Sequence, residues 1–260
     1  MSSAIPGTPN WVDLGSPDLE ASRGFYSDLF GWTAELSPDP QYGGYTIFSR
    51  EGQAVAGAGA LANDSQVPSW SIYLATDNAD TVATKVQNNG GTVVVAPMDV
   101  GQEGRMAVFT DPDGAVFSVW QGRNMPGAQL LNAPGALTWS ELTTRDPDRA
   151  KLFYSKVFGW GAQDNADSGV TYTMFTLRNK PLAGMMPMSS EATSANLPPL
   201  WMVYFAVTDC DATAARAGEL GGVVAVPPAD NAQGRFAVLN DPQGAVFSII
   251  TPADSGTAAG

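Results

Sequence analysis

The sequence predicts an α+β protein made of two copies of one domain, and two observations carry this prediction. The segment "NWVDLGSPDLEASRGFYSDLFGW" from residue 10 returns as "TWSELTTRDPDRAKLFYSKVFGW" from residue 138, so that Trp11 matches Trp139 at an offset of 128 residues. Both copies also close on nearly identical segments, "GRMAVFTDPDGAVFSV" and "GRFAVLNDPQGAVFSI". A repeat of this length indicates a duplicated domain rather than a solenoid.

Each copy begins with a strand and a helix. Alternating polar and apolar residues predict a short strand over residues 11–14. The following helix is expected to begin at the N-cap Ser16, with Pro17 at its first position, and to end before Gly31. The second copy has Asp146, Pro147 and Gly159 in the same three roles.

The rest of each copy is predicted from strand patterns and turn residues. In the first copy we expect strands over residues 45–49, 55–61 and 70–75. A second helix is expected over residues 79–88, and its counterpart over residues 210–219, each followed by a Gly-Gly pair. Three more strands follow, and tight "DPDG" or "DPQG" turns join the last two. Each copy is therefore interpreted as two βαβββ modules, and the chain as four.

The repeat also predicts the domain organisation. We expect one domain over residues 1–122 and a second over residues 135–253. The Gly/Pro-rich stretch between them predicts a linker over residues 123–134, and residues 254–260 are expected to form a flexible tail.

The net charge of the chain excludes some classes of binding partner. The chain has 13 Lys and Arg against 26 Asp and Glu, a formal net charge of −13. This negative field repels phosphate backbones and anionic lipids, so we expect neither a nucleic-acid nor a membrane partner. Because "MSSAIPGTPNW" lacks the basic and apolar regions of a signal peptide, a cytoplasmic protein is expected. We expect the chain to be a monomer or a homodimer.

The pattern resembles the vicinal oxygen chelate superfamily, which includes glyoxalase I, bleomycin-resistance proteins and extradiol dioxygenases. The resemblance rests on the "FYSDLFGW" and "FYSKVFGW" helices and on the "DPDGAVFSV" and "DPQGAVFSI" endings. More narrowly, "GTPNWVDL" and "GRFAVLNDPQGA" resemble two-copy actinobacterial glyoxalase-like proteins often labelled hydroxylases. The resemblance implies two cup-shaped curved sheets, each with a ligand inside the cup.

The metal-ligand positions of the superfamily are occupied by unusual residues in this chain. The resemblance places three of the four ligands of each copy on Trp11, Ser71 and Ser118, and on Trp139, Met202 and Ser248. The fourth belongs to a Gly-rich strand that offers no ligand atom in "VAGAGAL" or "LAGMMPM". Indole, hydroxyl and thioether groups are poor ligands for Zn²⁺ or Fe²⁺, and the chain contains no histidine. We therefore expect no metal and no other cofactor.

Candidate catalytic residues follow from strand alternation, because residues two apart point to the same face. If Trp11 faces the cup, so does Asp13, and Glu141 accompanies Trp139 in the same way. A carboxylate among aromatic rings has its pKa raised by desolvation, which suits a general acid or base near neutral pH. The predicted catalytic residues are Asp13, Glu141, Tyr73 and Tyr204. The predicted ligand-binding residues are Trp11, Trp139, Ser71, Met202, Ser118, Ser248, Trp120, Arg105 and Arg235.

Structural interpretations of the same residues stay open. The two tryptophans also suit a core, the carboxylates an exposed face, and the tyrosines packing between strands. The two arginines also suit ion pairs with nearby acids such as Asp111 and Asp241. The DPxG turns are expected to have a structural role alone.

Three functions remain as alternatives. The first is a metal-independent enzyme of secondary metabolism that acts on an aromatic, polyketide-like molecule by acid-base chemistry, in a dehydration, cyclisation or isomerisation. The second is a protein that binds and sequesters a hydrophobic natural product without chemistry. The third is a metal-dependent dioxygenase or glyoxalase-type lyase. The aromatic residues and the acid two residues after each tryptophan favour the first.

Overall fold

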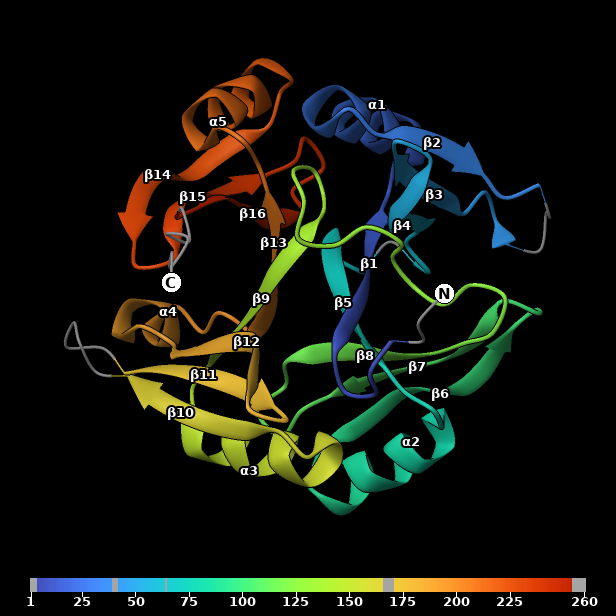
Figure 1. The fold of residues 1–260 in the computed structure, drawn as a ribbon, viewed down its shortest axis with the longest axis vertical. Helices are drawn as coiled ribbons and strands as arrows, with labels where there is room; N and C mark the ends of the chain where they lie inside the picture. Colours follow the sequence, from blue (N-terminus) through green and yellow to red (C-terminus); the bar gives the residue numbers. More distant parts are fainter. Residues whose placement is uncertain (1–3, 39–41, 64, 166–170, 254–260) are drawn as a thin grey trace, which may run out of the picture. The chain divides into compact units, whose positions relative to one another are not determined.

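The computed structural model describes residues 4–38, 42–63, 65–165 and 171–253 and confirms the α+β fold with its tandem βαβββ modules (Figure 1). The first copy contains β1 (Pro9–Ser16), α1 (Leu19–Phe30), β2 (Thr33–Leu36), β3 (Thr46–Arg50), β4 (Gln53–Ala60), β5 (Ser69–Ala75), α2 (Ala79–Asn88), β6 (Thr92–Val100), β7 (Gly104–Thr110) and β8 (Val116–Gly122). The second copy contains β9 (Leu137–Thr144), α3 (Pro147–Phe158), β10 (Gly161–Asn165), β11 (Tyr172–Leu177), β12 (Lys180–Pro187), α4 (Ser190–Ser194), β13 (Leu200–Ala206), α5 (Cys210–Glu219), β14 (Val223–Asn231), β15 (Gly234–Asn240) and β16 (Val246–Pro252).

Each copy forms a curved sheet of eight strands. The hydrogen-bonded order is β2-β3-β4-β1-β5-β8-β7-β6 in the first copy and β10-β11-β12-β9-β13-β16-β15-β14 in the second. The two orders are the same, and each contains two parallel pairs, β1 with β4 and β5 with β8 in the first copy. The short strands β2 and β10, which the sequence pattern did not predict, complete the first module of each copy.

The helix ends test the predicted caps. In α3 the prediction is confirmed: Asp146 is the N-cap, Pro147 opens the helix, and Gly159 ends it with φ of 76°. In α1 the predicted start is wrong, because the N-cap is Asp18, whose carboxylate accepts the Ala21 N–H at 2.9 Å. The bounds of α2 and α5 agree with the prediction.

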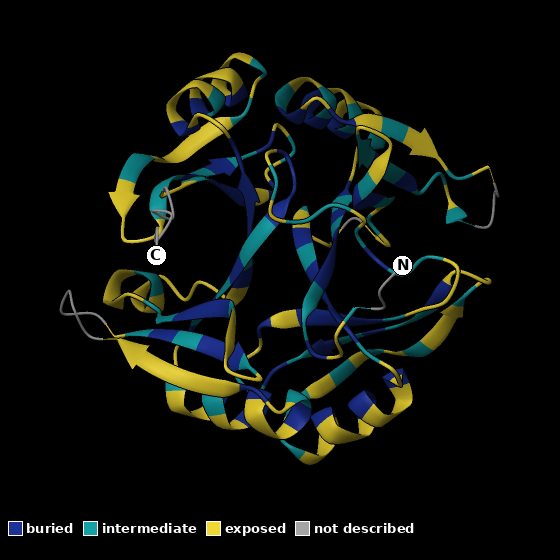
Figure 2. Cartoon of the chain, viewed as in Figure 1, coloured by how far each residue is buried: buried dark blue, intermediate teal, exposed yellow. Residues whose placement is uncertain are grey.

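The compact units of the chain combine modules from both copies. One unit comprises residues 1–11, 71–127 and 139–202, and the other comprises residues 12–70, 128–138 and 203–260. Each unit has its own hydrophobic core, and each core takes side chains from both copies. The buried residues of each long helix lie along one side (Figure 2), as expected for a helix packed on a sheet.

A buried hydrogen-bond cluster, the Tyr26 cluster, fixes α1 in the second unit. The Tyr26 hydroxyl donates to Asp241 Oδ2 at 3.0 Å and accepts from Trp70 Nε1 at 2.9 Å. The other carboxylate oxygen of Asp241 accepts backbone N–H groups of Gln243 and Ala245, at 3.0 and 2.8 Å. The acid of the "DPQG" turn thus links this turn, which belongs to the second copy, to a helix of the first.

The first unit contains the matching Tyr154 cluster. Tyr154 donates to Asp111 Oδ2 at 3.1 Å and accepts from Trp201 Nε1 at 2.8 Å. Asp111 Oδ1 accepts the backbone N–H groups of residues 113–115, each at 2.9 Å. Asp111 is therefore not the acid that pairs with Arg105, because its buried carboxylate is used by a tyrosine and by its own turn.

The repeat of the "FGW" motif in both copies also has a structural reason. Trp32 Nε1 donates to the carbonyl oxygen of Gly135 at 2.7 Å, and Trp160 Nε1 donates to that of Gly7 at 2.8 Å. Each tryptophan follows the first helix of one copy, and its acceptor immediately precedes the first strand of the other. The repeated motif therefore fastens the start of each copy to the other copy.

Because Tyr26 and Tyr154 are buried, we expect the folded protein to lose stability at alkaline pH. Burial, and then the nearby Asp241, raise the pKa of Tyr26 well above 10; burial and Asp111 do the same for Tyr154. Above about pH 10 the unfolded chain releases these protons and the folded chain keeps them, so the free energy of unfolding falls as pH rises, by up to about 1.4 kcal/mol per pH unit for each tyrosine.

Urea unfolding between pH 8 and pH 11 measures this effect. We expect the double variant Tyr26→Phe/Tyr154→Phe to be less stable at pH 8 and to have a smaller alkaline slope. If the free energy of unfolding fell equally steeply with pH in the variant and in the natural protein, the two tyrosines would not be its cause.

The single cysteine of the chain does not suit a nucleophilic role. Cys210 is buried, and burial, followed by the charge of Asp211, raises the pKa of its thiol to about 11, so a thiolate nucleophile is disfavoured at neutral pH.

Across the described residues, no helix is long and apolar enough to cross a membrane.

Candidate functional site

The first strand of each copy has one face in the core and one face turned away from it. In β1, Val12 and Leu14 belong to a core cluster, so Trp11 and Asp13 point to the opposite face. Trp11 is 3% exposed but belongs to neither core cluster. The long helices α1, α2, α3 and α5 all contribute side chains to the core clusters, and we call the opposite sheet face, which these four helices do not cover, the helix-free face.

The second copy repeats this arrangement with a more accessible indole. In β9, Leu142 joins the core, so Trp139 and Glu141 lie on the helix-free face. Trp139 is partly exposed, in contrast to the buried Trp11. In both strands, the tryptophan and the acid two residues after it therefore lie on the same face, as strand alternation predicts.

A tyrosine that the sequence analysis did not select joins the acid of the first copy. Tyr45, just before β3, donates from its hydroxyl to Asp13 Oδ1 at 2.5 Å. Both side chains are partly buried. Asp13 is in register with Gly57 of β4, where an added Cβ would lie 2.6 Å from Tyr45 Cζ and would overlap both the hydroxyl and the carboxylate. Only glycine leaves space for this pair.

The tyrosine of the second copy contacts the indole of its first strand. Trp139 Nε1 donates to the hydroxyl oxygen of Tyr172 at 3.2 Å. Glu141 is in register with Gly184 of β12, and an added Cβ at Gly184 would overlap the Tyr172 hydroxyl and lie 3.1 Å from Trp139 Nε1. The glycine has the same role as in the first copy, because it leaves space for the tyrosine and for the indole beside it.

The central strands bring a predicted tyrosine beside a predicted serine. Tyr73 of β5 is in register with Ser118 of β8, and Tyr204 of β13 is in register with Ser248 of β16. Ser71 and Met202 are each two residues before a tyrosine and partly exposed, on the same face. The hydroxyl of Ser248 is fully buried and has no hydrogen-bond partner among the described residues.

Trp120 and the two arginines are held by neighbouring groups. Trp120 is buried, and its Nε1 donates to the Met125 carbonyl oxygen at 2.7 Å. Arg105 forms two hydrogen bonds of 2.9 Å with Asp80 and an ion pair of 3.4 Å with Asp99.

Arg235 is held in the same way. It binds Asp211 through two nitrogens, one of them at 2.8 Å, and pairs with Asp230 at 3.2 Å. The interpretation of each arginine as the partner of a nearby acid is thus confirmed, with acids other than Asp111 and Asp241. Ligand binding by either arginine stays a prediction, and it would require the guanidinium to leave or share these carboxylates.

The donor set does not fit the metal centre of metal-dependent superfamily members. The implied ligand positions that can be assigned to single residues hold indoles, hydroxyls and a thioether, whereas Zn²⁺ and Fe²⁺ favour imidazole, carboxylate and thiolate. Over the described part of the chain, no three His, Cys, Asp or Glu residues gather to hold an ion. We therefore derive the chemistry from the side chains.

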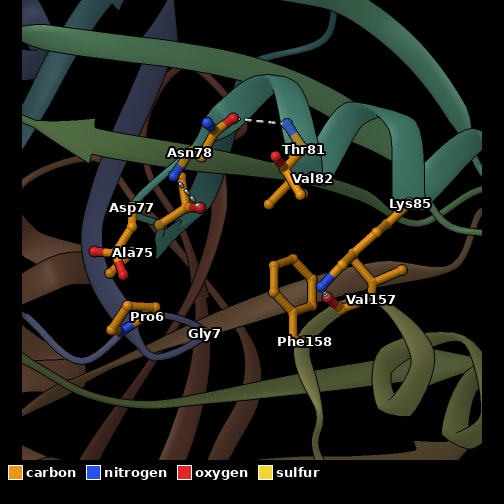
Figure 3. A pocket seen from close by; sticks show the side chains of 11 residues that line it. Pro6, Gly7, Ala75, Asp77, Asn78, Thr81, Val82, Lys85, Val157 and Phe158 are labelled. Carbon is orange, nitrogen blue, oxygen red and sulfur yellow. Dashed lines mark hydrogen bonds between the residues drawn. The ribbon is translucent and has the colours of Figure 1, made fainter.

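A pocket of about 220 Å³ lies at the start of α2 and contains none of the predicted site residues (Figure 3). Two of its polar groups are engaged within the protein: the Asn78 side chain caps α2 by accepting the Thr81 N–H at 2.8 Å, and Lys85 Nζ donates to the Val157 carbonyl oxygen at 3.3 Å. The lining also includes the carboxylate of Asp77.

Tyr45 and Tyr172 are the functional candidates that sequence reasoning missed. The signal was present, because "YTIF" and "YTMF" match between the copies, and each Gly-rich strand keeps a glycine opposite the acid. The sequence did not show in which direction these tyrosine side chains point. Tyr45 lies just before β3, and Tyr172 is the first residue of β11.

Comparisons with known proteins agree with the fold and the repeat. The family model described as Glyoxalase/Bleomycin resistance protein/Dioxygenase superfamily matches residues 8–119 and 136–249. The anthracycline biosynthesis proteins DauV of Streptomyces sp. (strain C5) and DnrV of Streptomyces peucetius are each 43% identical over 96% of this chain and 95% of their own length. The Mn(II)-bound glyoxalase from Novosphingobium aromaticivorans shares the fold, with a TM-score of 0.65 and 19% identity over 95% of this chain and 83% of its own.

Proposed function

The chain belongs to the Glyoxalase/Bleomycin resistance protein/Dioxygenase superfamily, and from this premise we propose that it is a metal-independent enzyme of secondary metabolism. Its proposed substrate is a polycyclic aromatic, polyketide-like molecule. The names of the 43% identical relatives refer to anthracycline biosynthesis, and anthracyclines belong to this chemical class. The proposed reaction is a proton transfer that leads to dehydration, cyclisation or isomerisation.

The hydrogen bond between Tyr45 and Asp13 carries this proposal. A carboxylate at 2.5 Å from a phenol hydroxyl, on a face that the core does not use, is a general base with an acidic partner beside it. Asp13 would remove a proton from a carbon next to a substrate carbonyl, and a tyrosine hydroxyl would stabilise the enolate oxygen. In an isomerisation the proton returns at another carbon; in a dehydration it leaves with hydroxide as water.

The residues on the helix-free faces support an aromatic substrate. Trp11, Trp120 and Tyr73 are aromatic, and Ser71 and Ser118 add hydroxyls. Aromatic side chains bind flat rings by stacking, while hydroxyls fix the position of ring oxygens. The proposed roles of Tyr73 and Tyr204 are to stabilise negative charge on such an oxygen.

Turnover by the Asp13→Asn variant tests the proposed function. EDTA-treated protein is incubated with a panel of polycyclic aromatic polyketide intermediates, and products are followed by mass spectrometry. We expect the natural protein to form a product and Asp13→Asn to lower kcat by about 10²- to 10⁴-fold, because asparagine cannot accept the proton. Asp148→Asn, at an exposed position of α3 outside the proposed site, is the control and is expected to keep the activity.

Two outcomes would overturn the proposal. If natural protein and variant bind the panel equally and no product ever forms, the protein sequesters its ligand. If activity is lost on EDTA treatment and returns with a stoichiometric transition metal, the reaction is metal-dependent.

A further inference from the structure

A glycine of β1 lies on the same face as the proposed base. Gly15 follows Asp13 by two residues, and Leu14 between them lies in the core, so both positions belong to the helix-free face. Two residues of an extended strand span about 6.8 Å. A flat ring bound against the Asp13 carboxylate therefore has Gly15 within reach of one of its edges.

The side chain of Leu61 covers Gly15 on this face. An added Cβ at Gly15 would lie 3.0 Å from Leu61 Cδ2, closer than an ordinary van der Waals contact. Leu61 directly follows β4, and its backbone N–H donates to the Ser16 carbonyl oxygen at 3.1 Å, which holds its main chain beside β1. Because Gly15 has no side chain, the leucine can lie over β1 close to the proposed base.

Tyr45 and Leu61 border the Asp13 carboxylate from two directions. Tyr45 reaches the carboxylate across β4, where an added Cβ at Gly57 would overlap its hydroxyl. Leu61 lies over the next residue of the same face of β1, toward the C-terminal end of the strand. All of these residues belong to one compact unit, within residues 12–70. The proposed base therefore has a phenol on one side and an aliphatic side chain on another.

The residues at both positions differ in the second copy. Thr143 stands in place of Gly15, and Met188 stands in place of Leu61. A threonine has the Cβ that, at Gly15, would crowd the leucine. The glycine and the leucine that lies over it thus occur together in the first copy, beside Asp13.

We propose that Leu61 is a specificity-determining residue of the first copy, an inference that rests on the proposed function of Asp13. Its methyl groups limit the substrate to flat rings with only hydrogen on the edge that lies over Gly15, because a methyl group there would overlap the leucine. They also cover this edge with apolar surface, against which a buried substrate hydroxyl would lose its hydrogen bonds to water. The substrate class is thereby narrowed to aromatic polyketide-like molecules with an unsubstituted ring edge next to the reacting carbon.

The binding of two matched probes to the full chain tests this role. The probes are 1,4-dihydroxyanthraquinone, the parent, and its 2,3,6,7-tetramethyl derivative, which carries methyl groups on the edges of both outer rings. Equilibrium dialysis measures both dissociation constants. We expect the natural protein to bind the parent about tenfold more tightly, and Leu61→Ala to bind both probes nearly equally, because alanine leaves space for a methyl group. Val67→Ala, at a position that is 75% exposed, is the control and should keep the natural ratio.

Gly15→Thr is a second variant, which introduces the residue of the second copy. The new side chain meets the end of the flexible Leu61 side chain rather than backbone, so the fold should be kept. Because it occupies space over β1, we expect it to weaken the binding of the parent by about tenfold. Circular dichroism checks that each variant is folded, and Gly15→Thr provides the result if Leu61→Ala is not.

The outcomes separate this proposal from the proposed function, because binding is measured without turnover. The role of Leu61 would be overturned if the natural protein bound neither probe, bound both equally, or had the same ratio as Leu61→Ala, even if a product is formed from another substrate. A ratio that falls about tenfold in Leu61→Ala would support it even if no product ever forms, and then only the proposed function fails.

Discussion

Alanine at Gly57 should lower kcat by about 10²-fold or more and leave the fold intact. The added Cβ would overlap the Tyr45 hydroxyl and the Asp13 carboxylate, which are the ends of two side chains rather than backbone. Both can swing aside without moving β4, but in doing so they separate the proposed base from its acidic partner. The measurement is kcat on the substrate found with the natural protein, together with the thermal unfolding midpoint.

Gly59→Ala is the matched control on the same strand. Gly59 lies two residues on, on the same face, and an added Cβ there would be 3.5 Å from Tyr45 Cδ2, an ordinary contact. We expect this variant to keep both stability and activity. If Gly57→Ala were as active as Gly59→Ala, the Tyr45–Asp13 contact would not be part of the reaction.

The strand faces could be predicted because they follow from one local rule. Side chains alternate along a strand, so fixing Trp11 on one face also fixes Asp13, and the core positions of Val12 and Leu14 agree. The repeat then transfers the same assignment to Trp139 and Glu141. No knowledge of distant contacts is needed for this step.

The start of α1 shows where local rules compete. Ser16 and Asp18 both have side chains that favour an N-cap, and Pro17 between them suits the first turn of a helix. Ser16 instead bonds to Ser22 at 2.7 Å, which leaves Asp18 to cap the helix. The side-chain partner inside the fold, invisible in the pattern, decides between two equally good caps.

The contacts made over long sequence distances could not be predicted from the repeat. A duplicated sequence suggests two domains that each enclose their own core, yet each core here combines a module of the first copy with a module of the second. For the same reason, the sequence could not show which side chain binds Asp111. An aspartate in a DPxG turn forms hydrogen bonds within the turn, and only the fold shows that its other oxygen accepts from Tyr154, 43 residues away.

Loss of the Asp111 carboxylate should lower the free energy of unfolding by about 4 kcal/mol. The Tyr154 hydroxyl and the backbone N–H groups of residues 113–115 would then lose their hydrogen-bond acceptor in the protein interior. The change is Asp111→Ala, and urea unfolding at pH 7 measures it. Tyr154→Phe should cost about 2 kcal/mol, since it leaves Trp201 Nε1 without its acceptor.

The double variant decides whether these residues act as one cluster. If they do, Asp111→Ala/Tyr154→Phe is less destabilised than the sum of the single variants, by about 1 kcal/mol or more, because the hydrogen bond between them is lost only once. Asp148→Ala, at an exposed position of α3, is the control and should change stability by less than about 0.5 kcal/mol. Strict additivity would mean that Asp111 supports its own turn alone. Coupling would mean that the turn of the first copy and the helix of the second stabilise each other, which is the expected consequence of a core that both copies share.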